Sequence, residues 1–357
     1  MHYLVTGGAG FIGANYVHRL LSRGEEVTVY DNLSRQGADA NLKWLQAEFG
    51  KDAFRFVHGD IRNASLITTM AIDANVIVHL AAQVAVTTSV ERPREDIEIN
   101  AMGTFNVLEA ARFSPNRPAV LYASTNKVYG GMENLVVEEK DTRYVYRDYP
   151  YGIPESYPTD FHSPYGCSKG AADQYVRDYA RIYGLRTVVF RQSCIYGPRQ
   201  FGVEDQGWVA WFLIAAQLGK SITIYGDGKQ VRDLLFIDDL LDAYDAGLRS
   251  IGRVSGQIYN LGGGHENSLS VWRELSPLLT ELRGEPVPVS WGDWRPGDQR
   301  IFIADIRKAE RELNWHPKVG VEEGIRRLYD WVAEHESLLR AYVGTGTETS
   351  DSMGRQN

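Results

Sequence analysis

Tyr165 and Lys169 stand four residues apart in the run SPYGCSK (163–169) and could form a proton-transferring pair. Residues i and i+4 share one face of a helix, so the phenol and the ammonium are expected side by side. A free phenol has a pKa of about 10 and is a poor base at neutral pH. A neighbouring positive charge favours the phenolate, which lets a tyrosine take a proton from a hydroxyl group. A surface Tyr–Lys contact without chemistry is the alternative.

A hydroxyl group for the same site is expected from Ser124 or Thr125, which follow the apolar run VLYA (120–123). Either side chain could hydrogen-bond the reacting oxygen. A Ser or Thr at this place can equally be a helix cap or a turn residue. The order of these residues along the chain, taken with the glycine-rich turn described next, is more specific than any one of them.

Gly7, Gly10 and Gly13 follow the first apolar run with the spacing G-x-x-G-x-x-G. The standard dinucleotide fingerprint is G-x-G-x-x-G, but the physical reason for the glycines is the same. They allow a tight turn and a close approach of a pyrophosphate to the N-terminus of a helix. A glycine-rich turn without a ligand is the alternative.

Asp31 ends the second expected strand, where a carboxylate can hydrogen-bond the ribose hydroxyls of a dinucleotide. Its charge would repel a 2′-phosphate, so the sequence favours NAD over NADP, and Arg35 weakens this preference only slightly. Asp60 follows the third expected strand and could bond the adenine amino group. Both aspartates also fit turn positions.

Strands and helices that alternate along the first half of the chain must position these residues. This pattern predicts an α/β fold with a Rossmann-type, doubly wound parallel sheet. The expected strands are Tyr3–Thr6, Glu26–Tyr30, Phe54–His58, Val76–Leu80, Val120–Ala123 and Thr187–Arg191. Helical patterns cover Gly10–Ser22, Asn100–Ala111 and Tyr165–Tyr183.

The character of the chain changes after about residue 191, where loops lengthen and aromatic residues cluster. A strand that runs into an acidic helix start is expected at Leu234–Asp239, a strand at Gln257–Leu261 and a helix near Val321–His335. We expect an NAD-binding domain from residues 1–191 and 234–262. Residues 192–233 and 263–343 would form a smaller, discontinuous substrate-binding α/β lobe, and residues 344–357 a disordered tail.

The composition of the 357 residues is ordinary for a globular protein, with 43% apolar and 24% charged residues. The net charge of −8 argues against binding to nucleic acid or an anionic membrane. Neither a membrane helix nor a leader peptide is recognisable. Cys167 and Cys194 are too few for a disulfide framework, and no Cys/His spacing suggests a zinc site. We therefore expect a cytoplasmic protein without a metal.

Several strings along the chain resemble the extended short-chain dehydrogenase/reductase family of nucleotide-sugar epimerases and dehydratases. The resemblance runs from Tyr3 to about His335. It includes TGGAGFIG (6–13), DNLS (31–34), GDIR (59–62), HLAA (79–82), Asn100, YGCSK (165–169), VRD (231–233), RPGD (295–298) and ADIRKAERELNWHPK (304–318).

The resemblance implies roles for individual residues. Thr125 would be the catalytic hydroxyl, Tyr165 the base, and Lys169 the residue that tunes it and binds the nicotinamide ribose. The implied NAD-binding residues are Gly7, Gly10, Phe11, Ile12, Gly13, Asp31, Asn32, Ser34, Arg35, Asp60, Ile61, Leu80, Ala81, Ala82, Gln83, Asn100, Ser124, Tyr165 and Lys169. The implied substrate-binding residues are Thr87, Thr88, Asn126, Cys194, Arg199, Gln200, Gln206, Trp208, Arg232 and Arg295.

The triplet Thr125-Asn126-Lys127 narrows the reaction that the resemblance implies. The 4,6-dehydratases carry Thr-Asp-Glu here, whose two acids perform the elimination, and neither Asn nor Lys can replace them. UDP-hexose 4-epimerases carry small neutral residues instead. The strings STNKVYG (124–130), DFHSPYGCSKGAADQY (160–175), RQFGVEDQGWVAWF (199–212) and GKQVRD (228–233) resemble the subgroup of CDP-paratose 2-epimerases, also called CDP-tyvelose 2-epimerases.

That subgroup inverts C2 of a CDP-activated sugar through a transient 2-keto intermediate, with NAD retained and no net redox change. The resemblance implies carbohydrate metabolism, O-antigen synthesis for lipopolysaccharide, and a homodimer or homotetramer. Two alternatives stay open. One is a UDP- or GDP-hexose 4-epimerase, and the other a non-catalytic nucleotide-binding protein.

Overall fold

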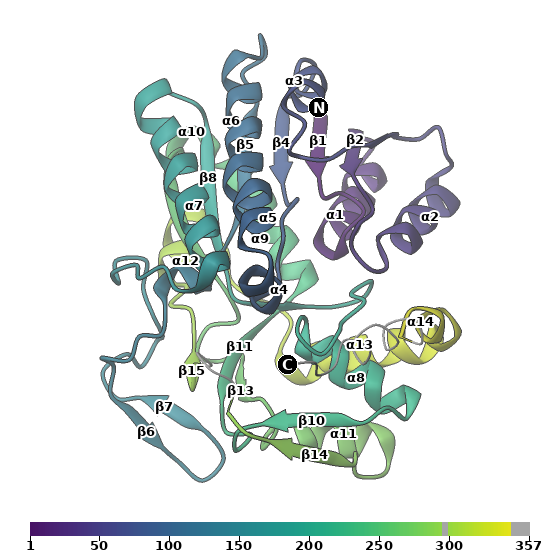
Figure 1. The fold of residues 1–357 in the computed structure, drawn as a ribbon, viewed down its shortest axis with the longest axis vertical. Helices are drawn as coiled ribbons and strands as arrows, with labels where there is room; N and C mark the ends of the chain where they lie inside the picture. Colours follow the sequence, from purple (N-terminus) through teal and green to yellow (C-terminus); the bar gives the residue numbers. More distant parts are fainter. Residues whose placement is uncertain (295–298, 344–357) are drawn as a thin grey trace, which may run out of the picture.

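A parallel sheet of seven strands in the order β12-β8-β5-β4-β1-β2-β3 forms the centre of the computed structural model (Figure 1). The structure describes residues 1–294 and 299–343. The strands are β1 (His2–Thr6), β2 (Glu26–Asp31), β3 (Arg55–His58), β4 (Val76–His79), β5 (Ala119–Thr125), β8 (Thr187–Gln192) and β12 (Gln257–Leu261). The predicted Rossmann-type α/β fold is confirmed. The main difference is β5, which continues to Thr125 and therefore carries both candidate hydroxyl residues.

Helices cover both faces of this sheet, and alternate strand residues point to opposite sides. Leu4 and Ile77 pack with α3, α6 and α7, whereas Val5 and Val78 pack with α1, α2 and α9. Each such fully buried side chain contributes about 1.5–3 kcal/mol. The helices are α1 (Phe11–Ser22), α2 (Ala38–Phe49), α3 (Ala64–Ala71), α6 (Gly103–Phe113), α7 (Ser163–Tyr183) and α9 (Ile237–Arg249).

The strand order reverses between β1 and β4. The chain moves outward from β1 to β2 and β3, then returns to place β4 on the other side of β1. The loops after β1 and β4 therefore diverge at one edge of the sheet, which is where ligands bind in folds of this kind. The two loops are close: a Cβ on Gly7 would lie 2.7 Å from Ala81 N.

The helix expected at Asn100–Ala111 is built differently. A short helix, α5 (Pro93–Ile97), leads into a wider π turn, η1 (Glu98–Met102), before α6 starts at Gly103. Single π turns inside a helical path are frequent at functional sites. Here the π turn contains Asn100, and the Asn100 side chain forms hydrogen bonds with the backbone of Gln83.

A second group of elements lies below the large sheet in Figure 1. Its small sheet contains β9 (Cys194–Tyr196), β11 (Val231–Phe236), β13 (Ser268–Ser270) and β15 (Ile301–Phe302). Strand pairs form from β10 (Ile222–Tyr225) with β14 (Val289–Gly292), and from β6 (Val137–Glu139) with β7 (Tyr144–Tyr146). The remaining elements are α4 (Val86–Glu91), η2 (Asn126–Tyr129), α8 (Trp208–Leu218), α10 (Ile251–Val254), α11 (Leu275–Arg283), α12 (Arg307–Leu313), α13 (Val321–Glu334) and α14 (Glu336–Val343).

The predicted domain boundary at residue 234 falls inside β11. That strand belongs to the small sheet, while β12 joins the large one. The strand expected at Leu234–Asp239 starts earlier, at Val231, and gives way to α9 at Ile237. The division into two domains stays a prediction.

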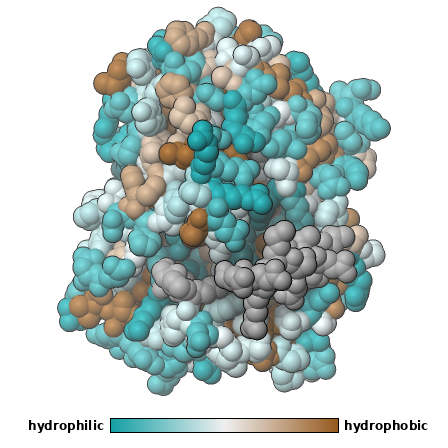
Figure 2. All heavy atoms as spheres, viewed as in Figure 1, coloured by the Kyte–Doolittle hydropathy of each residue, from teal (hydrophilic) through white to brown (hydrophobic). Residues whose placement is uncertain are grey.

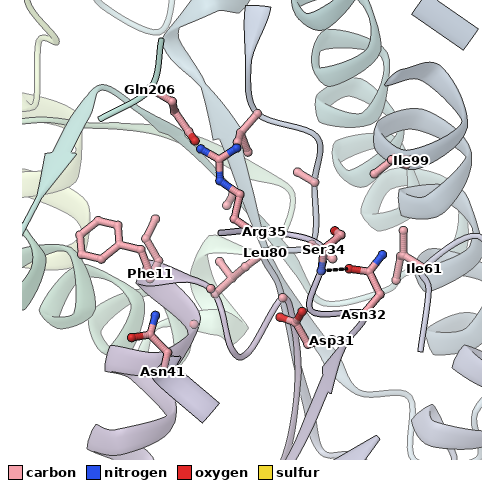
Figure 3. Close-up of a pocket in the computed structure, with 18 of the residues that line it drawn as sticks. Phe11, Asp31, Asn32, Ser34, Arg35, Asn41, Ile61, Leu80, Ile99 and Gln206 are labelled. Carbon is pink, nitrogen blue, oxygen red and sulfur yellow. Dashed lines mark hydrogen bonds between the residues drawn. The ribbon is translucent and has the colours of Figure 1, made fainter. Parts of the chain in front are cut away.

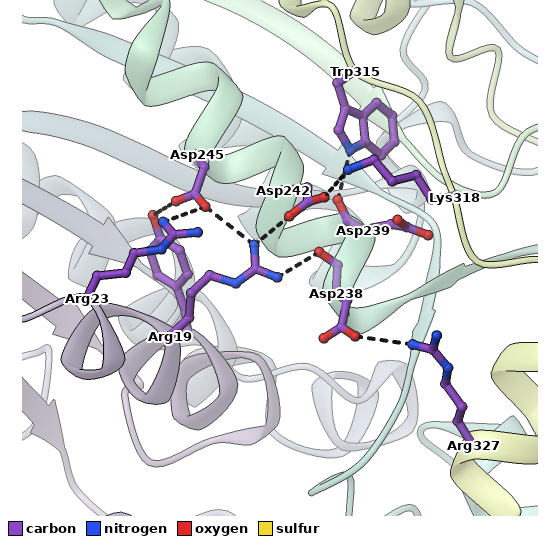
Figure 4. Close-up of polar contacts among 10 residues, drawn as sticks. Arg19, Arg23, Asp238, Asp239, Asp242, Asp245, Trp315, Lys318 and Arg327 are labelled. Atoms are coloured by element: carbon purple, nitrogen blue, oxygen red, sulfur yellow. Dashed lines mark hydrogen bonds and ion pairs between the residues drawn. The ribbon is translucent and has the colours of Figure 1, made fainter. Parts of the chain in front are cut away.

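Acidic side chains along α9 connect it to α1 and to the C-terminal segment (Figure 4). Arg19 Nη1 donates to Asp242 Oδ1 at 2.7 Å, and Arg23 lies 2.8 Å from Asp245. Partly exposed ion pairs contribute only about 0–1 kcal/mol each. The buried edge-to-face contact of Tyr16 with Tyr244, at 5.6 Å, adds apolar burial to the same interface. Helix α1, which follows the glycine-rich turn, is thus held in place by its contacts with α9.

Polar residues cover most of the face drawn in Figure 2, and apolar residues form small separate groups there. Among the described residues, no helix combines the length and the apolar character that crossing a bilayer requires. Two expectations, the tail at residues 344–357 and the role of Arg295, lie outside the described residues.

Candidate active site

A cavity opens at the edge of the sheet where β1 and β4 diverge (Figure 3). It brings together all the predicted cofactor residues except Gln83 and Asn100. Its walls include Gly7, Gly10, Phe11, Ile12, Gly13, Asp31, Asn32, Ser34, Arg35, Asp60, Ile61, Leu80, Ala81, Ala82, Ser124, Tyr165 and Lys169. Three predicted substrate residues, Arg199, Gln200 and Gln206, line the same cavity.

The glycine-rich turn leaves no room for side chains. A Cβ on Gly13 would lie 2.1 Å from Gly7 O, and Gly7 itself has a positive φ of 70°. No side chain caps the N-terminus of α1, whose first turn lines the cavity. A helix N-terminus of this kind attracts anionic groups. The cradle therefore fits the pyrophosphate of a dinucleotide.

Asp31 is almost fully buried at the base of this cradle. Its Oδ2 accepts a hydrogen bond from Ala9 N at 3.0 Å, and its Oδ1 accepts one from Leu33 N at 2.8 Å. Burial raises the pKa of this carboxyl, and the backbone hydrogen bonds oppose the rise. The Asp31 carboxylate thus stabilises the glycine-rich turn through Ala9 N. It also lies in the cavity wall where a ribose would bind.

Asp60 already has hydrogen-bond donors from the protein, and the Arg35 side chain points away from Asp31. Both observations bear on the predicted roles of these residues in cofactor binding. Arg62 binds the Asp60 carboxylate at 2.8 Å and lowers its pKa to about 2, and Asn32 Nδ2 donates to it at 3.1 Å. An adenine amino group would therefore share this carboxylate with two other donors. Figure 3 shows that Arg35 extends toward Gln206 and away from Asp31.

Tyr165 and Lys169 lie on one face of α7 at the inner end of the cavity, as their spacing predicts. Lys169 Nζ donates a hydrogen bond to Ala123 O at 2.6 Å and lies 4.4 Å from the centre of the Tyr122 ring. The Thr125 hydroxyl is near enough to the Tyr165 phenol to lower its pKa. The structure thus joins the end of β5 to the start of α7, two segments that are 40 residues apart in the sequence.

The prediction that the Tyr165 pKa is lowered is wrong for the protein without NAD. Burial raises this pKa to about 12, although the hydrogen bond with Thr125 opposes the rise. Burial also lowers the pKa of Lys169 to about 7, against the attraction of Asp173 and Asp96. The cause is desolvation, which disfavours the charged form of both groups and outweighs the lysine charge on which the prediction relied.

The two hydroxyl residues at the end of β5 have different partners. Thr125 Oγ1 accepts a hydrogen bond from Lys127 N at 3.3 Å, so Thr125 caps η2 as well as contacting Tyr165. Ser124 Oγ donates to Asp173 Oδ2 at 2.8 Å. Thr125 is therefore the hydroxyl placed to support the phenol, while Ser124 belongs to a buried polar network.

Asn100 and Gln83 lie outside the cavity walls. Asn100 is buried, and its side chain accepts from Gln83 N at 2.9 Å and donates to Gln83 O at 3.0 Å. It therefore fixes the end of the loop whose first residues, Leu80 to Ala82, line the cavity. The observed contacts of Asn100 are with the protein.

The remaining predicted substrate residues fall into separate places. The thiol of Cys194 is hydrogen-bonded with Trp208 and lies near the charge of Arg232, and burial raises its pKa to about 12. Thr87 is exposed and its hydroxyl lies 3.5 Å from Asp205, whereas Thr88 is half-buried. Asn126 accepts a hydrogen bond from Thr125 at 3.4 Å.

A second cavity lies close to the predicted catalytic residues and was not foreseen from the sequence. Its walls include Lys127, two residues after Thr125, and Ser163, two residues before Tyr165. Apolar side chains form much of the rest, namely Val86, Val90, Met132, Leu135, Val137 and Ile301. Lys127 Nζ reaches Gln299 Oε1 at 3.3 Å and so connects this wall to the C-terminal part of the chain.

Other polar residues at the site carried no usable signal in the sequence. Asp173 pairs with Arg191 through two hydrogen bonds of 2.9 and 3.0 Å, and both side chains are buried. Asn41 lines the cavity and donates to Ala9 O and Arg199 O. These partners are far apart in the chain, so no local spacing could reveal them.

Comparison with known proteins agrees with this geometry. The sequence model of the family described as GDP-mannose 4,6 dehydratase matches residues 4–328. The chain belongs to this family. The CDP-paratose 2-epimerase of Salmonella typhi is 47% identical over 345 residues, which are 93% of this chain and 99% of the relative. The UDP-glucose 4-epimerase of Mycolicibacterium smegmatis is 35% identical, with 93% of this chain and 98% of the relative covered.

Solved structures of the family have the same fold. The dTDP-glucose 4,6-dehydratase DesIV of Streptomyces venezuelae, solved with NAD and TYD bound, superposes with a TM-score of 0.80 at 32% identity. That alignment covers 95% of this chain and 98% of DesIV. The predictions of an extended short-chain dehydrogenase/reductase fold, of NAD as the cofactor and of an isomerase as the enzyme class are confirmed.

Proposed function

We propose that this chain inverts C2 of a CDP-activated sugar of the CDP-paratose type, using tightly held NAD and producing no net redox change. The observation that carries the proposal is the triplet Thr125-Asn126-Lys127 beside the Tyr165 phenol. The similarity to the Salmonella typhi CDP-paratose 2-epimerase over nearly the whole chain supports it.

The chain's own groups account for the proton transfers that such a reaction needs. With NAD bound, the positive nicotinamide ring would add to the charge of Lys169 and favour the Tyr165 phenolate over the phenol. The phenolate takes the proton of the C2 hydroxyl and later returns it, while Thr125 holds the same oxygen. Lys169 supplies a positive charge beside the phenol and a donor toward the nicotinamide ribose. The glycine-rich cradle and Asp31 would hold NAD, whose nicotinamide would supply the hydride acceptor and donor for C2.

Elimination of water from the sugar does not suit these residues. It requires an acid and a base next to the catalytic hydroxyl, and this chain has an amide at Asn126 and an amine at Lys127. The amide does not titrate, and the amine is directed to Gln299. Epimerisation needs neither group and uses only Tyr165 and Thr125.

Inversion requires the keto sugar to present its other face, so the site needs space next to Tyr165. We assign this space to the second cavity, whose walls include Ser163 and Lys127. The nucleotide would stay anchored by Arg232 and the residues around Cys194 and Trp208 while the sugar turns. The keto sugar could then present its opposite face to the nicotinamide without dissociation of the nucleotide sugar from the enzyme.

A second copy of the chain is the proposed protein partner. Exposed apolar residues gather along α6 and α7, where Phe105 packs edge-to-face with Tyr175 at 6.2 Å. Ile182 and Tyr183 extend the same face. This apolar face supports a dimer or tetramer.

The two unpaired cysteines fit a cytoplasmic enzyme, and O-antigen synthesis is the proposed pathway context.

A UDP- or GDP-hexose 4-epimerase is the second candidate, because 4-epimerases also match the whole chain. Incubation of the purified protein with CDP-, UDP- and GDP-hexoses, followed by NMR of the products, separates the two. Inversion at C2 of a CDP-sugar is the expected result. Inversion at C4 would replace the proposal with the second candidate. Absence of any reaction, with NAD added and a CDP-3,6-dideoxyhexose in the panel, would overturn both.

A further inference from the structure

Asp96 is a buried carboxylate behind the catalytic turn, and the mechanism above gives it no role. It lies on α5 and is fully buried. Its carboxylate accepts hydrogen bonds from Ser168 Oγ at 2.5 Å and from Asn100 Nδ2 at 3.1 Å. In residues 1–294 and 299–343, no cationic side chain forms an ion pair with it. A buried charge without a paired cation is costly, so its presence calls for a function.

The two donors connect Asp96 to both sides of the active site. Ser168 stands between Tyr165 and Lys169 on α7, and its Oγ also contacts Tyr165 O at 3.2 Å. Asn100 Nδ2 donates to Ser168 Oγ at 3.1 Å and, with the rest of its amide, holds the backbone of Gln83. Asp96 thus joins the catalytic turn to the loop that lines the cofactor cavity.

The other buried carboxylate near Lys169 is already balanced. Asp173 is paired with the Arg191 guanidinium through two hydrogen bonds and also accepts from Ser124. The Lys169 ammonium itself contacts two neutral groups, the Ala123 carbonyl and the Tyr122 ring. Asp173 and Asp96 both act on Lys169, and Asp96 is the one of the two whose charge has no cationic partner in the described residues.

The titration directions agree with this geometry. Burial lowers the pKa of Lys169, and the charges of Asp173 and Asp96 oppose this. Burial raises the pKa of Asp96, and the Ser168 hydrogen bond and the charge of Lys169 oppose that rise. Asp96 also raises the pKa of Tyr165. His79, the remaining titratable group near Lys169, has its pKa lowered to about 3, mainly by burial, and is neutral.

We propose that Asp96 is a positioning residue for the catalytic pair. Its charge keeps Lys169 cationic at neutral pH, and its hydrogen bonds to Ser168 and Asn100 hold the turn from Tyr165 to Lys169 against the cofactor loop. The role rests on the proposed function, because it matters for turnover only if Lys169 acts there as a cation.

The first test is the pH profile of the holoenzyme with Asp96→Asn, which removes the charge and retains the shape. We expect the high-pH limb of kcat to move to lower pH by about one unit, as loss of a nearby opposite charge predicts. The Michaelis constant should change little. Glu95→Gln is the matched control, because Glu95 is the preceding residue on α5 and its side chain is 40% exposed, so its high-pH limb should stay in place. If Asp96→Asn does not fold, Asp96→Ser removes the same charge.

The second test needs neither substrate nor cofactor. NMR of 13Cε-labelled lysine in the NAD-free protein follows the titration of Lys169, with the signal assigned by its loss in Lys169→Arg. We expect a lower midpoint in Asp96→Asn than in the parent protein. A uniform loss of kcat at every pH with an unchanged midpoint would reduce Asp96 to a structural residue and overturn the proposal. A shifted midpoint in a protein that turns over no nucleotide sugar would overturn the proposed function and leave the electrostatic role of Asp96 intact.

Discussion

The Lys169 ammonium donates a hydrogen bond to the Ala123 carbonyl at 2.6 Å, across the gap between α7 and β5. This contact orients a buried cation toward the cavity, where the phenol of Tyr165 lies one helical turn away. Burial makes the cation costly, as the pKa of about 7 indicates. The proposed mechanism therefore uses a buried charge that lowers the stability of the fold.

Replacement of this lysine is expected to separate stability from activity. Lys169→Met should raise the stability of the NAD-free protein at pH 7 by about 1–3 kcal/mol, because the burial cost exceeds the value of one charge-assisted hydrogen bond. The folded-state pKa is lowered, so the parent gains stability as the pH rises from about 7 toward 10.5, and the difference should shrink over that range. Urea unfolding at several pH values measures it.

The same variant should lose at least about 100-fold in kcat, within the range for loss of acid–base assistance. Asp178→Ala, on an exposed part of α7, controls for general effects on this helix. Equal or lower stability of Lys169→Met at pH 7 would show that the cation is not a net cost to the fold.

Gly13→Ala should damage the cofactor cradle. Its Cβ would meet Gly7 O at 2.1 Å and Gly8 Cα at 2.7 Å, so the start of α1 must move. Overpacking of this kind costs about 1–3 kcal/mol. Gly252→Ala is the control, because its Cβ meets no atom within 4 Å, and it should be neutral or stabilising. Thermal unfolding with and without NAD measures both effects. Full protection of Gly13→Ala by NAD would contradict the assigned cradle.

Asp31→Asn should weaken NAD binding by about 10- to 100-fold, since a hydrogen bond to a charged group contributes about 1.5–3 kcal/mol. The variant should also discriminate less against NADP, because the charge that repels a 2′-phosphate is gone. Calorimetric titration of the NAD-stripped protein with both cofactors tests this. Exposed Asp52→Asn provides the control. An unchanged ratio of the two affinities would remove Asp31 from cofactor selection.

Local sequence patterns were sufficient to predict the sheet and the shared helix face of Tyr165 and Lys169. The i, i+4 spacing placed Tyr165 and Lys169 together, because both lie on one helix. Asp96 was not predictable, since its partner Ser168 is 72 residues away and meets it only through the packing of α5 on α7. The direction of the Tyr165 pKa was missed for a related reason. A sequence gives the neighbouring charges along a helix, but burial depends on the whole fold.

Asp233 should make the stability of the protein depend on pH. It is a fully buried residue of β11 in the small sheet, and it accepts hydrogen bonds from Gly264 N at 3.3 Å, from Ala304 N at 3.2 Å and from the Ser193 hydroxyl. Burial nevertheless raises its pKa from 3.8 to about 6. Between these two values the folded protein holds a proton that the unfolded chain releases. The contribution of Asp233 to stability therefore falls as the pH rises from about 4 to about 6.

The expected size of this effect is about 3 kcal/mol, at 1.36 kcal/mol for each pH unit of the shift. Asp233→Asn retains the shape and an acceptor oxygen but has no proton to lose. The difference in unfolding free energy between the parent and this variant should therefore fall by about 3 kcal/mol from pH 4 to pH 7, when measured by urea unfolding of the NAD-free protein. Asp52→Asn, which replaces an exposed carboxylate by an amide, is the control for the substitution itself. A constant difference for Asp233→Asn would mean that its three donors hold the carboxylate ionised throughout, and that the hydrogen bonds outweigh the desolvation.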